Sequence, residues 1–375
     1  MHSTQVIQTW EEFARLENEW NPLLRSSASD AIFLTFEWMA SWASVVGQHV
    51  PPVIAIARDR EKRLSGIAPL YAAPYRFLKV FPFRVLRMIA DYGSGFEYPD
   101  FIARQGHEKV IYAALIRALQ ATSCPWDCLW LSDVPTWTGA FERLSTGFGA
   151  AGFHVQSRNK INGKVDLPDS IEAYMLALSR NQRSQLRRQI KKVMSRKDVE
   201  ILHCRTPDEL PRFLDALFAL HHKRRMLLGD PGTFCRMPVQ VDFYRKFAAR
   251  ALSKGWLWLY ALAEAGRIRA VQLGYVYNRA FHQLQEGFDP DYVSGVGNVL
   301  RYEIIKKCIQ GGVKVYDFLG GMSEHKRRWG ARKRFGRDLL AGPKKPKNFF
   351  LFKKQVWPTG RYLKPQPIIA GNQSK

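Results

Sequence analysis

The chain has 375 residues, 46% of them hydrophobic and 13% aromatic, and at roughly 100 to 200 residues per domain this length predicts two domains or one large one. The chain has 57 Lys and Arg against 33 Asp and Glu, which gives a formal charge of +24. A typical small-molecule enzyme in free solution is less basic than this. The charge favours an anionic partner, which could be nucleic acid, an anionic membrane surface or a phosphate-bearing cofactor or substrate. No window approaches the ~18 consecutive apolar residues of a membrane span and the N-terminus lacks a signal-peptide pattern, so we expect a cytoplasmic protein, with a peripheral place on the inner face of the membrane as the alternative.

The first half of the sequence alternates between short apolar strands and amphipathic helices. Apolar residues three and four apart predict helices over residues 10–24, 33–46, 107–123 and 136–152. Apolar or alternating runs predict strands over residues 4–10, 51–59, 63–73, 83–93, 98–104 and 126–134. Residues 153–168 have the pattern of a hairpin that closes this half.

The second half repeats this order of elements. A strand over residues 199–206 precedes two helices, and the first of these helices begins with Pro207 in its first turn. Two strands joined by a tight Ala-Gly-Arg turn follow, and then come a third strand, a glycine-containing loop, a helix, a strand and a basic segment, over residues 255–278, 280–288, 289–298, 299–312, 313–321 and 322–337.

These elements predict an α/β fold with mixed sheets in two tandem, similarly built halves. We expect an N-terminal domain over residues 1–168 and a basic connecting helix over residues 169–198. A C-terminal domain over residues 199–342 and a basic tail rich in Pro, Lys and aromatic residues over 343–375 complete the chain.

Most of the positive charge lies in two segments. Residues 179–197 hold eight basic residues and no acidic one, and residues 321–375 hold fifteen basic against two acidic residues, a net charge of +13. The first segment is either a solvated helix face or a surface for the phosphates of tRNA or of an anionic membrane, with Arg183, Arg187, Arg188 and Lys191 as the contacts. The tail is either a disordered basic segment or an interface with anionic lipid.

Four short motifs in the second half carry a family resemblance. They are GFDPDY at Gly287–Tyr292, Gly297 followed by Leu300, YDFLGG at Tyr316–Gly321, and Lys326 followed by Trp329. In this order they resemble the CelD-like and FemAB-like tandem acyltransferases of the GNAT superfamily, whose element order also matches the second half. The chain departs from that pattern at Val296, where the family usually has Pro, and at His325, where it usually has Tyr.

The resemblance implies a binding site for the acyl donor at the glycine loop. In a GNAT domain the pyrophosphate of acyl-CoA lies on backbone N–H groups at the start of the helix after the fourth strand, where unpaired N–H groups and the helix dipole favour an anion. The corresponding residues here are Ser294, Gly295, Val296, Gly297 and Asn298. The alternative is an ordinary helix cap. Acyl-CoA, above all acetyl-CoA, is the expected donor, although Fem-type relatives use aminoacyl-tRNA.

Three residues are candidate catalytic groups. Alternation along residues 281–287 predicts that His282 and Glu286 share one face of the strand, where either could accept a proton from an attacking amine. The alternative is a salt bridge for Glu286 and a half-buried histidine. The resemblance assigns Lys326 to the reacting ester or a phosphate, against a plain basic surface as its alternative.

Asp317, Gly320 and Trp329 of the closing motifs are the candidate substrate-binding residues, and a capping role for Asp317 is equally compatible with its position. The five cysteines show no metal-ligand spacing and the adjacent His221 and His222 diverge on a helix, so we expect no metal. With no nucleophile–base pair in a recognisable context, transfer would be direct.

The expected function is a GNAT-type acyltransferase that moves an acyl group from acyl-CoA to an amine or hydroxyl of a sugar or of a cell-envelope or exopolysaccharide precursor. One alternative is Fem-like transfer from aminoacyl-tRNA, and another is a non-catalytic protein that binds nucleic acid or an anionic membrane. The glycine-loop and closing-lysine motifs are absent from the N-terminal half, which we expect to be a degenerate GNAT-like domain with a structural or acceptor-positioning role.

Overall fold

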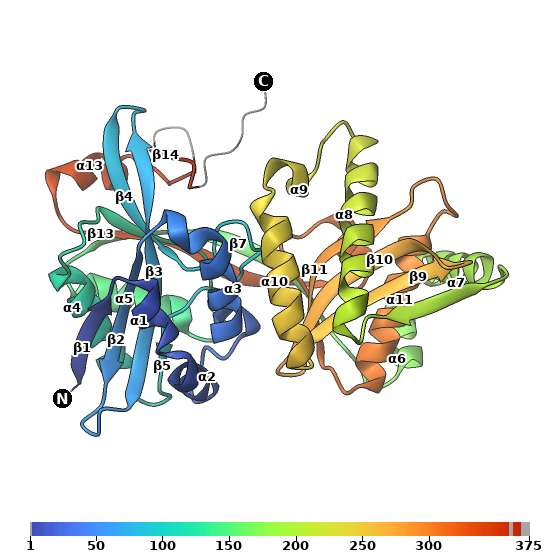
Figure 1. Cartoon of the computed structure of the whole chain (residues 1–375), viewed down its shortest axis with the longest axis horizontal. Helices are drawn as coiled ribbons and strands as arrows, with labels where there is room; N and C mark the ends of the chain where they lie inside the picture. The colour runs from blue at the N-terminus through green and yellow to red at the C-terminus, as the bar shows by residue number, and fades with distance from the viewer. Residues whose placement is uncertain (1, 360–362, 369–375) are drawn as a thin grey trace. The chain divides into compact units, whose positions relative to one another are not determined.

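The computed structural model describes residues 2–359 and 363–368 and divides into two compact units (Figure 1). Unit 1 comprises residues 1–160 and 335–375, and unit 2 comprises residues 161–334. The sequence placed the limits at residues 168 and 342 instead. The difference arises because strands β7 (His154–Asp166) and β13 (Arg332–Gly342) each begin in one unit and end in the other.

The sheet of unit 1 has the strand order β1-β2-β3-β4-β6-β13, with β5 and β14 also paired to β3. Its strands are β1 (Ser3–Ile7), β2 (Pro52–Arg58), β3 (Leu64–Phe77), β4 (Phe81–Met88), β5 (Ile102–Ala103), β6 (Cys128–Pro135) and β14 (Leu363–Pro365). Its helices are α1 (Trp10–Ala14), α2 (Glu17–Arg25), α3 (Phe36–Val46), α4 (Glu108–Ala121), α5 (Ala140–Ala150) and α13 (Pro346–Lys353), with 3-10 turns at Ile32–Leu34 and Gly47–His49.

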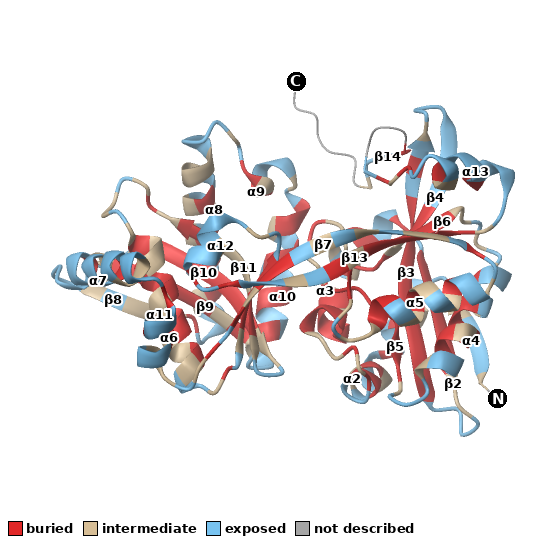
Figure 2. Cartoon of the chain, turned by 180° about the vertical axis from the view of Figure 1, so that it is seen from behind, coloured by how far each residue is buried: buried red, intermediate tan, exposed pale blue. Residues whose placement is uncertain are grey.

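Helices cover both faces of this sheet. Helices α1, α2 and α3 lie on the face seen in Figure 1, and α4 and α5 lie on the face seen in Figure 2. Fully buried Trp20, Trp38 and Trp42 belong to α2 and α3. Large aromatic side chains thus fill the layer between the first three helices and the sheet.

The sheet of unit 2 has the strand order β7-β12-β11-β10-β9-β8. Its remaining strands are β8 (Val199–His203), β9 (Leu257–Glu264), β10 (Arg267–Tyr277), β11 (Ala280–Phe288) and β12 (Val315–Gly320). Its helices are α6 (Ile171–Ala177), α7 (Arg180–Met194), α8 (Leu210–Met226), α9 (Thr233–Arg236), α10 (Val239–Ser253), α11 (Val296–Gln310) and α12 (Glu324–Arg328), with a 3-10 turn at Pro207–Glu209.

In unit 2, α8 and α10 cover one face of the sheet (Figure 1) and α6, α7 and α11 lie on the other (Figure 2). Leu262, Phe281, Val299, Ile304 and Tyr316 belong to one buried cluster. This cluster joins β9, β11 and β12 to α11, so the strand and helix that carry the glycine loop share a single core.

Local signals explain several confirmed elements. Thr206 and Glu209 form a capping box that starts the turn before α8, with Pro207 as its first residue. Ala265 and Gly266 both have positive φ, as a two-residue hairpin turn between β9 and β10 requires. The expected α/β class with mixed sheets is therefore confirmed, and β11 and β12 are the parallel pair of unit 2.

Other expectations were wrong. Residues 153–168 form the single strand β7 instead of a hairpin, since the Asn-Gly pair at residues 162–163 does not turn the chain. Residues 10–24 split into α1 and α2. Two basic segments had been given no secondary structure. Residues 322–337 contain α12 and the start of β13, and the described part of the tail contains α13 and β14. Residues 360–362 and 369–375 of the tail lie outside the described residues. Among the described residues, none of the helices has the length and apolarity needed to cross a membrane.

Candidate active site

The candidate site lies where β11 and β12 stop pairing. The parallel ladder joins Ala280–His282 to Val315–Asp317, and β11 then continues to Phe288 while β12 ends at Gly320. We call this region the β11–β12 fork. Ligands of open α/β sheets bind at the carboxyl ends of parallel strands, and α11 begins shortly after β11 ends.

The predicted glycine loop forms the start of α11. Gly295 is the N-cap with φ 93°, a conformation that suits glycine, and Val296 is the first helical residue. A Cβ atom on Gly295 would lie 2.5 Å from the side chain of Gln189 in α7. Asn298 Nδ2 donates to Gln189 Oε1 over 3.1 Å. The basic helix α7 therefore packs directly on the first turn of α11.

This arrangement fits the phosphate groups of an acyl donor. Two glycines leave the backbone at the start of α11 unshielded by side chains of their own, and the fifteen-residue helix directs its positive dipole end there. Gln189 is the neighbouring side chain that a bound phosphate would contact or displace. Ser294 is exposed, whereas Val296 is buried and belongs to the core.

A buried arginine organises the polar side of the fork. The side chain of Arg301, on α11, forms an ion pair with Glu286 of β11, and its Nη1 donates to His325 Nε2 over 2.8 Å. Arg224 Nη1 lies 3.4 Å from Glu286 Oε1. Phe318 and Trp329 place their rings beside the Arg301 guanidinium, 5.7 and 5.1 Å from the ring centres.

These contacts set the protonation states. Burial alone would raise the pKa of Glu286, but the charges of Arg301 and Arg224 outweigh it and hold that pKa below its usual range. Burial and the neighbouring Arg301 lower the pKa of His325 to about 4. Since guanidinium groups only donate, His325 accepts through Nε2 and carries its proton on Nδ1. Glu286 is thus an ionised carboxylate and His325 a neutral imidazole.

The sequence did not identify Arg301 as a site residue. The signal was a charged residue in the apolar stripe that Leu300 and Ile304 mark on α11. Arg301 is 1% exposed, and a fully buried arginine needs a carboxylate partner. A scan for charged residues on the buried face of a helix would have found it.

His282 and Glu286, which the sequence predicted on one face of β11, lie in different surroundings in the structure. The ladder between β10 and β11 shifts at Leu284, which is an extra residue in β11 and forms a bulge. Glu286 therefore lies beside Gln283, whose Nε2 is 3.2 Å from Glu286 Oε2. The sequence-based alternation was wrong because a bulge reverses the faces beyond it.

His282 belongs to a different contact set, with Asp317. The Nδ1 atom of His282 lies 3.9 Å from Asp317 Oδ2, and Arg334 Nη2 lies 2.5 Å from the same carboxylate oxygen. Burial lowers the pKa of His282 to about 4, because the opposing charge of Asp317 is too weak to compensate. Asp317 is 1% exposed and also accepts from the backbone N–H of Leu319 over 2.8 Å.

The Lys326 ammonium is bound by backbone carbonyl groups at the end of β12. Its Nζ donates to the carbonyl oxygens of Phe318, Leu319, Gly320 and Gly321 over 2.8, 3.2, 2.6 and 3.0 Å. Leu319 has φ 60°, an unfavourable backbone conformation for leucine. Asp317 accepts from the N–H of Leu319 and Lys326 donates to its carbonyl oxygen, so both side chains hold this conformation.

The other predicted substrate contacts have different surroundings. Gly320 is exposed, and its carbonyl faces Lys326. Trp329 is buried, and its backbone carbonyl accepts from Tyr174 Oη over 3.0 Å. Trp329 is therefore a core residue whose ring contacts Arg301.

The predicted contacts on α7 fall into two groups. Arg183 Nη1 donates to the carbonyls of Leu176 and Leu178 and so caps the end of α6. Arg187 and Lys191 line a cavity of about 500 Å³ between α6, α7 and α11, whose other walls include Met175, Ile190 and Tyr302. Arg188 is exposed.

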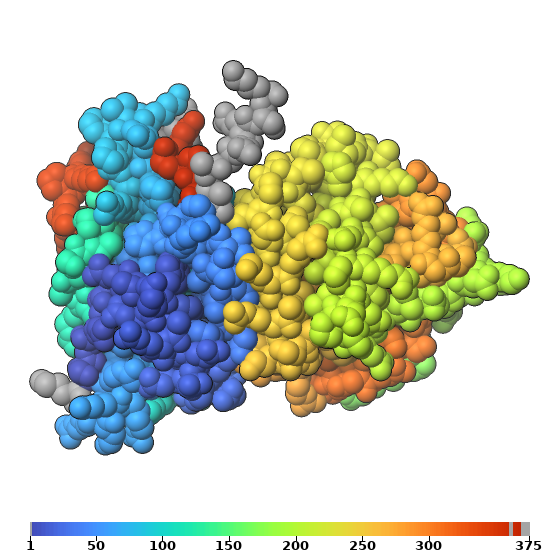
Figure 3. Space-filling view, in the orientation of Figure 1, coloured from blue at the N-terminus to red at the C-terminus, as the bar shows by residue number. Residues whose placement is uncertain are grey.

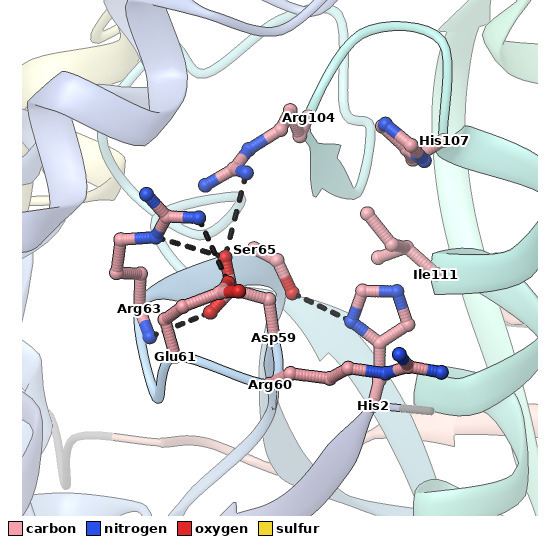
Figure 4. A pocket seen from close by; sticks show the side chains of 9 residues that line it. All are labelled: His2, Asp59, Arg60, Glu61, Arg63, Ser65, Arg104, His107 and Ile111. Carbon is pink, nitrogen blue, oxygen red and sulfur yellow. Dashed lines mark hydrogen bonds and ion pairs between the residues drawn. The ribbon is translucent and has the colours of Figure 1, made fainter.

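Unit 1 has a cavity of about 310 Å³ beside the turn between β2 and β3 (Figure 4). Arg63 and Arg104 converge there on the carboxylate of Asp59, over 3.0 and 3.4 Å, and His2 Nδ1 lies 3.1 Å from Ser65 Oγ. This cavity has no helix start beside it of the kind that Gly295 and Val296 form at the fork, so we do not place the site there. Among the described residues of both units, no group of three or more His, Cys, Asp or Glu side chains is placed to hold a metal ion.

Comparison with known proteins gives one family match, in unit 2. Residues 180–327 match the family model described as an acetyltransferase (GNAT) domain, which covers the fork, α7 and α11. No curated protein matches the chain.

Solved structures resemble the whole chain in fold. A crystal structure of FemX matches with a TM-score of 0.65 at 10% identity, over 93% of this chain and 100% of that one. L-PGS from Bacillus licheniformis matches with a TM-score of 0.52 at 12% identity, over 90% of this chain and 96% of that one. A conserved protein of unknown function from Bacteroides thetaiotaomicron matches with a TM-score of 0.52 at 14% identity, over 92% of this chain and 100% of that one.

Proposed function

We propose that this chain is an acyltransferase of the GNAT superfamily and that it transfers an acyl group from acyl-CoA to an amine or hydroxyl of a sugar or cell-envelope precursor. Residues 180–327, which match the GNAT domain, and the fold that the chain shares with FemX support this proposal. The observation that carries the proposal is the start of α11, where Gly295 lies against Gln189 of the basic helix α7 and Gly297 lies against Phe288 at the end of β11. Acetyl-CoA is the donor to test first.

The chain's own groups would hold the donor by its phosphates. Backbone N–H groups of Gly297 and Asn298 lie in the first turn of α11, and the amide of Gln189 adds a neutral donor next to them. The exposed cations of α7 raise the local concentration of anions. When bound, the donor supplies the thioester carbonyl that the acceptor attacks.

Glu286 is the proposed proton acceptor. Its carboxylate stays ionised because Arg301 and Arg224 lower its pKa, so it is ready to take the proton from an attacking amine, directly or through water. The low pKa also makes it a weak base, which suits an amine that loses its proton only as the new bond forms. Arg301 and the neutral His325 fix the orientation of the carboxylate.

We assign Lys326, His282 and Asp317 to positioning. Lys326 donates its hydrogen bonds to the carbonyl groups at the end of β12. Asp317 accepts from the backbone N–H of Leu319 and forms an ion pair with Arg334. Gly320, exposed at the mouth of the fork, is the proposed contact for the acceptor, while Trp329 keeps the Arg301 guanidinium in place.

The test is titration of the purified chain with acetyl-CoA and longer acyl-CoAs, followed by thiol release in the presence of amino-sugar acceptors. Binding that weakens on Gln189→Glu and persists on Gln189→Asn supports the proposed cradle, because only the first change adds a negative charge beside the phosphates. Failure to bind any CoA ester overturns the donor assignment.

Transfer from aminoacyl-tRNA is the second candidate. The similarity to FemX over the whole chain and the exposed cations of α7 favour it. Retention of bulk tRNA at ~150 mM salt, lost on reversing Arg187, Arg188 and Lys191, would support this donor because phosphate contacts dominate nonspecific binding and weaken with salt. Binding of acyl-CoA without tRNA retention would exclude it.

A further inference from the structure

Unit 1 exposes an apolar surface with a basic rim that the acyl-transfer site does not use. The turn between β3 and β4 exposes Leu78 and Val80 by 46 and 65%, and Phe81, the first residue of β4, is 57% exposed. Helix α13 exposes Phe349 by 60%. We call these residues, with the partly exposed Phe350, the hairpin–α13 patch.

The two parts of the patch lie together although they are far apart in sequence. The rings of Phe77 and Phe350 meet at 5.4 Å in an edge-to-face contact, and Lys347 Nζ lies 4.9 Å from the ring centre of Phe83. Figure 3 shows the tip of the β3–β4 hairpin in light blue, with atoms of the C-terminal segment beside it in red. The patch is therefore one surface formed by two segments of the same unit.

The two segments that form the patch are rich in cations. Residues 76–84 contain Arg76, Lys79 and Arg84, and residues 344–354 contain five lysines, while neither segment contains Asp or Glu. Among these cations, Lys347 pairs with Asp127 over 2.8 Å. A monomeric surface rarely collects exposed Leu, Val and Phe at one point, and such a collection marks an interaction site.

The turn itself keeps these side chains at the tip against a local preference. Leu78 and Lys79 have φ 51 and 66°, and the N–H of Val80 donates to the carbonyl of Phe77 over 3.2 Å. Three residues, 78–80, connect Phe77 to its partner Phe81, and the first two of them have the positive φ that normally selects Asn, Asp or Gly. Leucine and lysine make this turn less stable, and strain of this kind is typical of positions retained for function.

We propose that the hairpin–α13 patch binds the surface of an anionic phospholipid membrane. The aliphatic and aromatic tip would enter the boundary between headgroups and acyl chains, and the surrounding Lys and Arg would contact lipid phosphates. A nucleic acid would use the cations but has no place for Leu78 and Val80, which cannot stack on bases as aromatic rings do. This surface would bring the acyltransferase to an acceptor held at the membrane, and it does not depend on the identity of the donor.

The decisive variant is Leu78→Asn/Lys79→Gly. It installs the preferred turn residues, so the hairpin should become more stable, while the apolar and basic tip is lost. We expect flotation with phosphatidylcholine–phosphatidylserine vesicles to fall by about tenfold, since one apolar anchor and one lysine are each worth several-fold in affinity. A purely structural role for the tip predicts unchanged or improved flotation.

A second variant, Phe81→Ser/Phe349→Ser, tests the apolar contribution without touching the turn. Val110→Ser, at another exposed apolar position of unit 1, is the matched control and should float like the parent chain. Three outcomes would overturn the proposal. The chain could float equally well with pure phosphatidylcholine vesicles and with vesicles that contain phosphatidylserine, or both tip variants could float like the parent chain. In the third outcome the tip supports retention of tRNA instead of flotation. Acyl-CoA binding measured on the same variants should be unchanged, which separates this test from that of the proposed function.

Discussion

Each unit has one place where two parallel strands stop pairing, the β11–β12 fork in unit 2 and a corresponding fork between β4 and β6 in unit 1. The chain segments and side chains at the two forks differ. In unit 1 the parallel pairs are Val85 with Cys128 and Leu86 with Leu129, and β4 ends at Met88. In unit 2 the glycine loop leads from β11 directly into α11. In unit 1 a loop with left-handed Ala90, Gly93, Gly95 and Tyr98 follows β4 and leads into the short strand β5, and only then does α4 begin. The N-terminal fork therefore has no helix start directly after its first strand.

Both forks contain an arginine paired with a carboxylate beside a tryptophan. In unit 1, Arg87 Nε lies 2.5 Å from Asp91 Oδ2, its guanidinium lies 4.1 Å from the ring centre of Trp130, and Tyr71 donates to Asp91 over 2.9 Å. Burial raises the pKa of Asp91 despite the charge of Arg87. In unit 2 the pKa of Glu286 is lowered instead. The two pairs thus differ in the protonation that they favour, since the pKa of the carboxyl group is raised in unit 1 and lowered in unit 2.

The largest expected effect comes from removing each arginine. Arg301→Met and Arg87→Met each leave a buried carboxylate without its main cation, and we expect a loss of about 3 to 5 kcal/mol in unfolding free energy for each. Denaturant unfolding measures it. Only Arg301→Met should also abolish acyl transfer in the protein that remains folded. A neutral Arg87→Met would show that the pair in unit 1 does not support the fold.

Exchanging each carboxylate for its amide sharpens the comparison on activity. Glu286→Gln keeps the shape but removes the proton acceptor, and we expect kcat to fall about 100-fold. The matched change Asp91→Asn should leave kcat unchanged, because Asp91 belongs to unit 1 and pairs there with Arg87 and Tyr71. Steady-state thiol release on both variants is the measurement, and equal rates for the two variants would remove Glu286 from the mechanism.

The sequence predicted the order of elements and the helix start better than the side-chain geometry of the fork. Gly295 and Gly297 followed from the resemblance at the glycine loop, and the structure places Gly295 at the N-cap and Gly297 in the first turn of α11. The expected pairing of His282 with Glu286 failed at Leu284, since a bulge depends on how β10 and β11 align and leaves no local signature. Arg301 was overlooked because an arginine on a helix is normally exposed, and only its burial reveals its role.

We expect the unfolding free energy of unit 2 to fall at acid pH because of its buried histidines. Burial lowers the pKa of His221 and His282 to about 4, below the usual value near 6.5, so the unfolded chain binds more protons between these values. Their contribution is complete above pH 6.5 and is lost as the pH falls towards 4, by about 2 kcal/mol per histidine between pH 6.5 and 5.

The unit 1 carboxyls act in the opposite direction. Burial raises the pKa of Asp91 and Asp100, so they take up protons more readily in the folded state and gain stability as the pH falls. Urea unfolding at pH 7.5 and 5, for the parent chain and for His221→Gln, measures the balance. A pH dependence that His221→Gln leaves unchanged would contradict the assignment of the loss to buried histidine.

The smallest expected effect comes from replacing one glycine in each of two loops, the loop before α11 in unit 2 and the loop after β4 in unit 1. Gly295 and Gly93 have φ 93 and 69°, so alanine at either position should cost about 1 kcal/mol of stability. At Gly295 the new methyl group would also meet Gln189 at the start of α11, where the donor phosphates are proposed to bind. Gly295→Ala should therefore weaken acyl-CoA binding in a calorimetric titration about tenfold, a loss of about 1.4 kcal/mol, while Gly93→Ala leaves it unchanged. Equal affinities for the two variants would mean that the loop of unit 2 is only a helix cap, like any other turn before a helix.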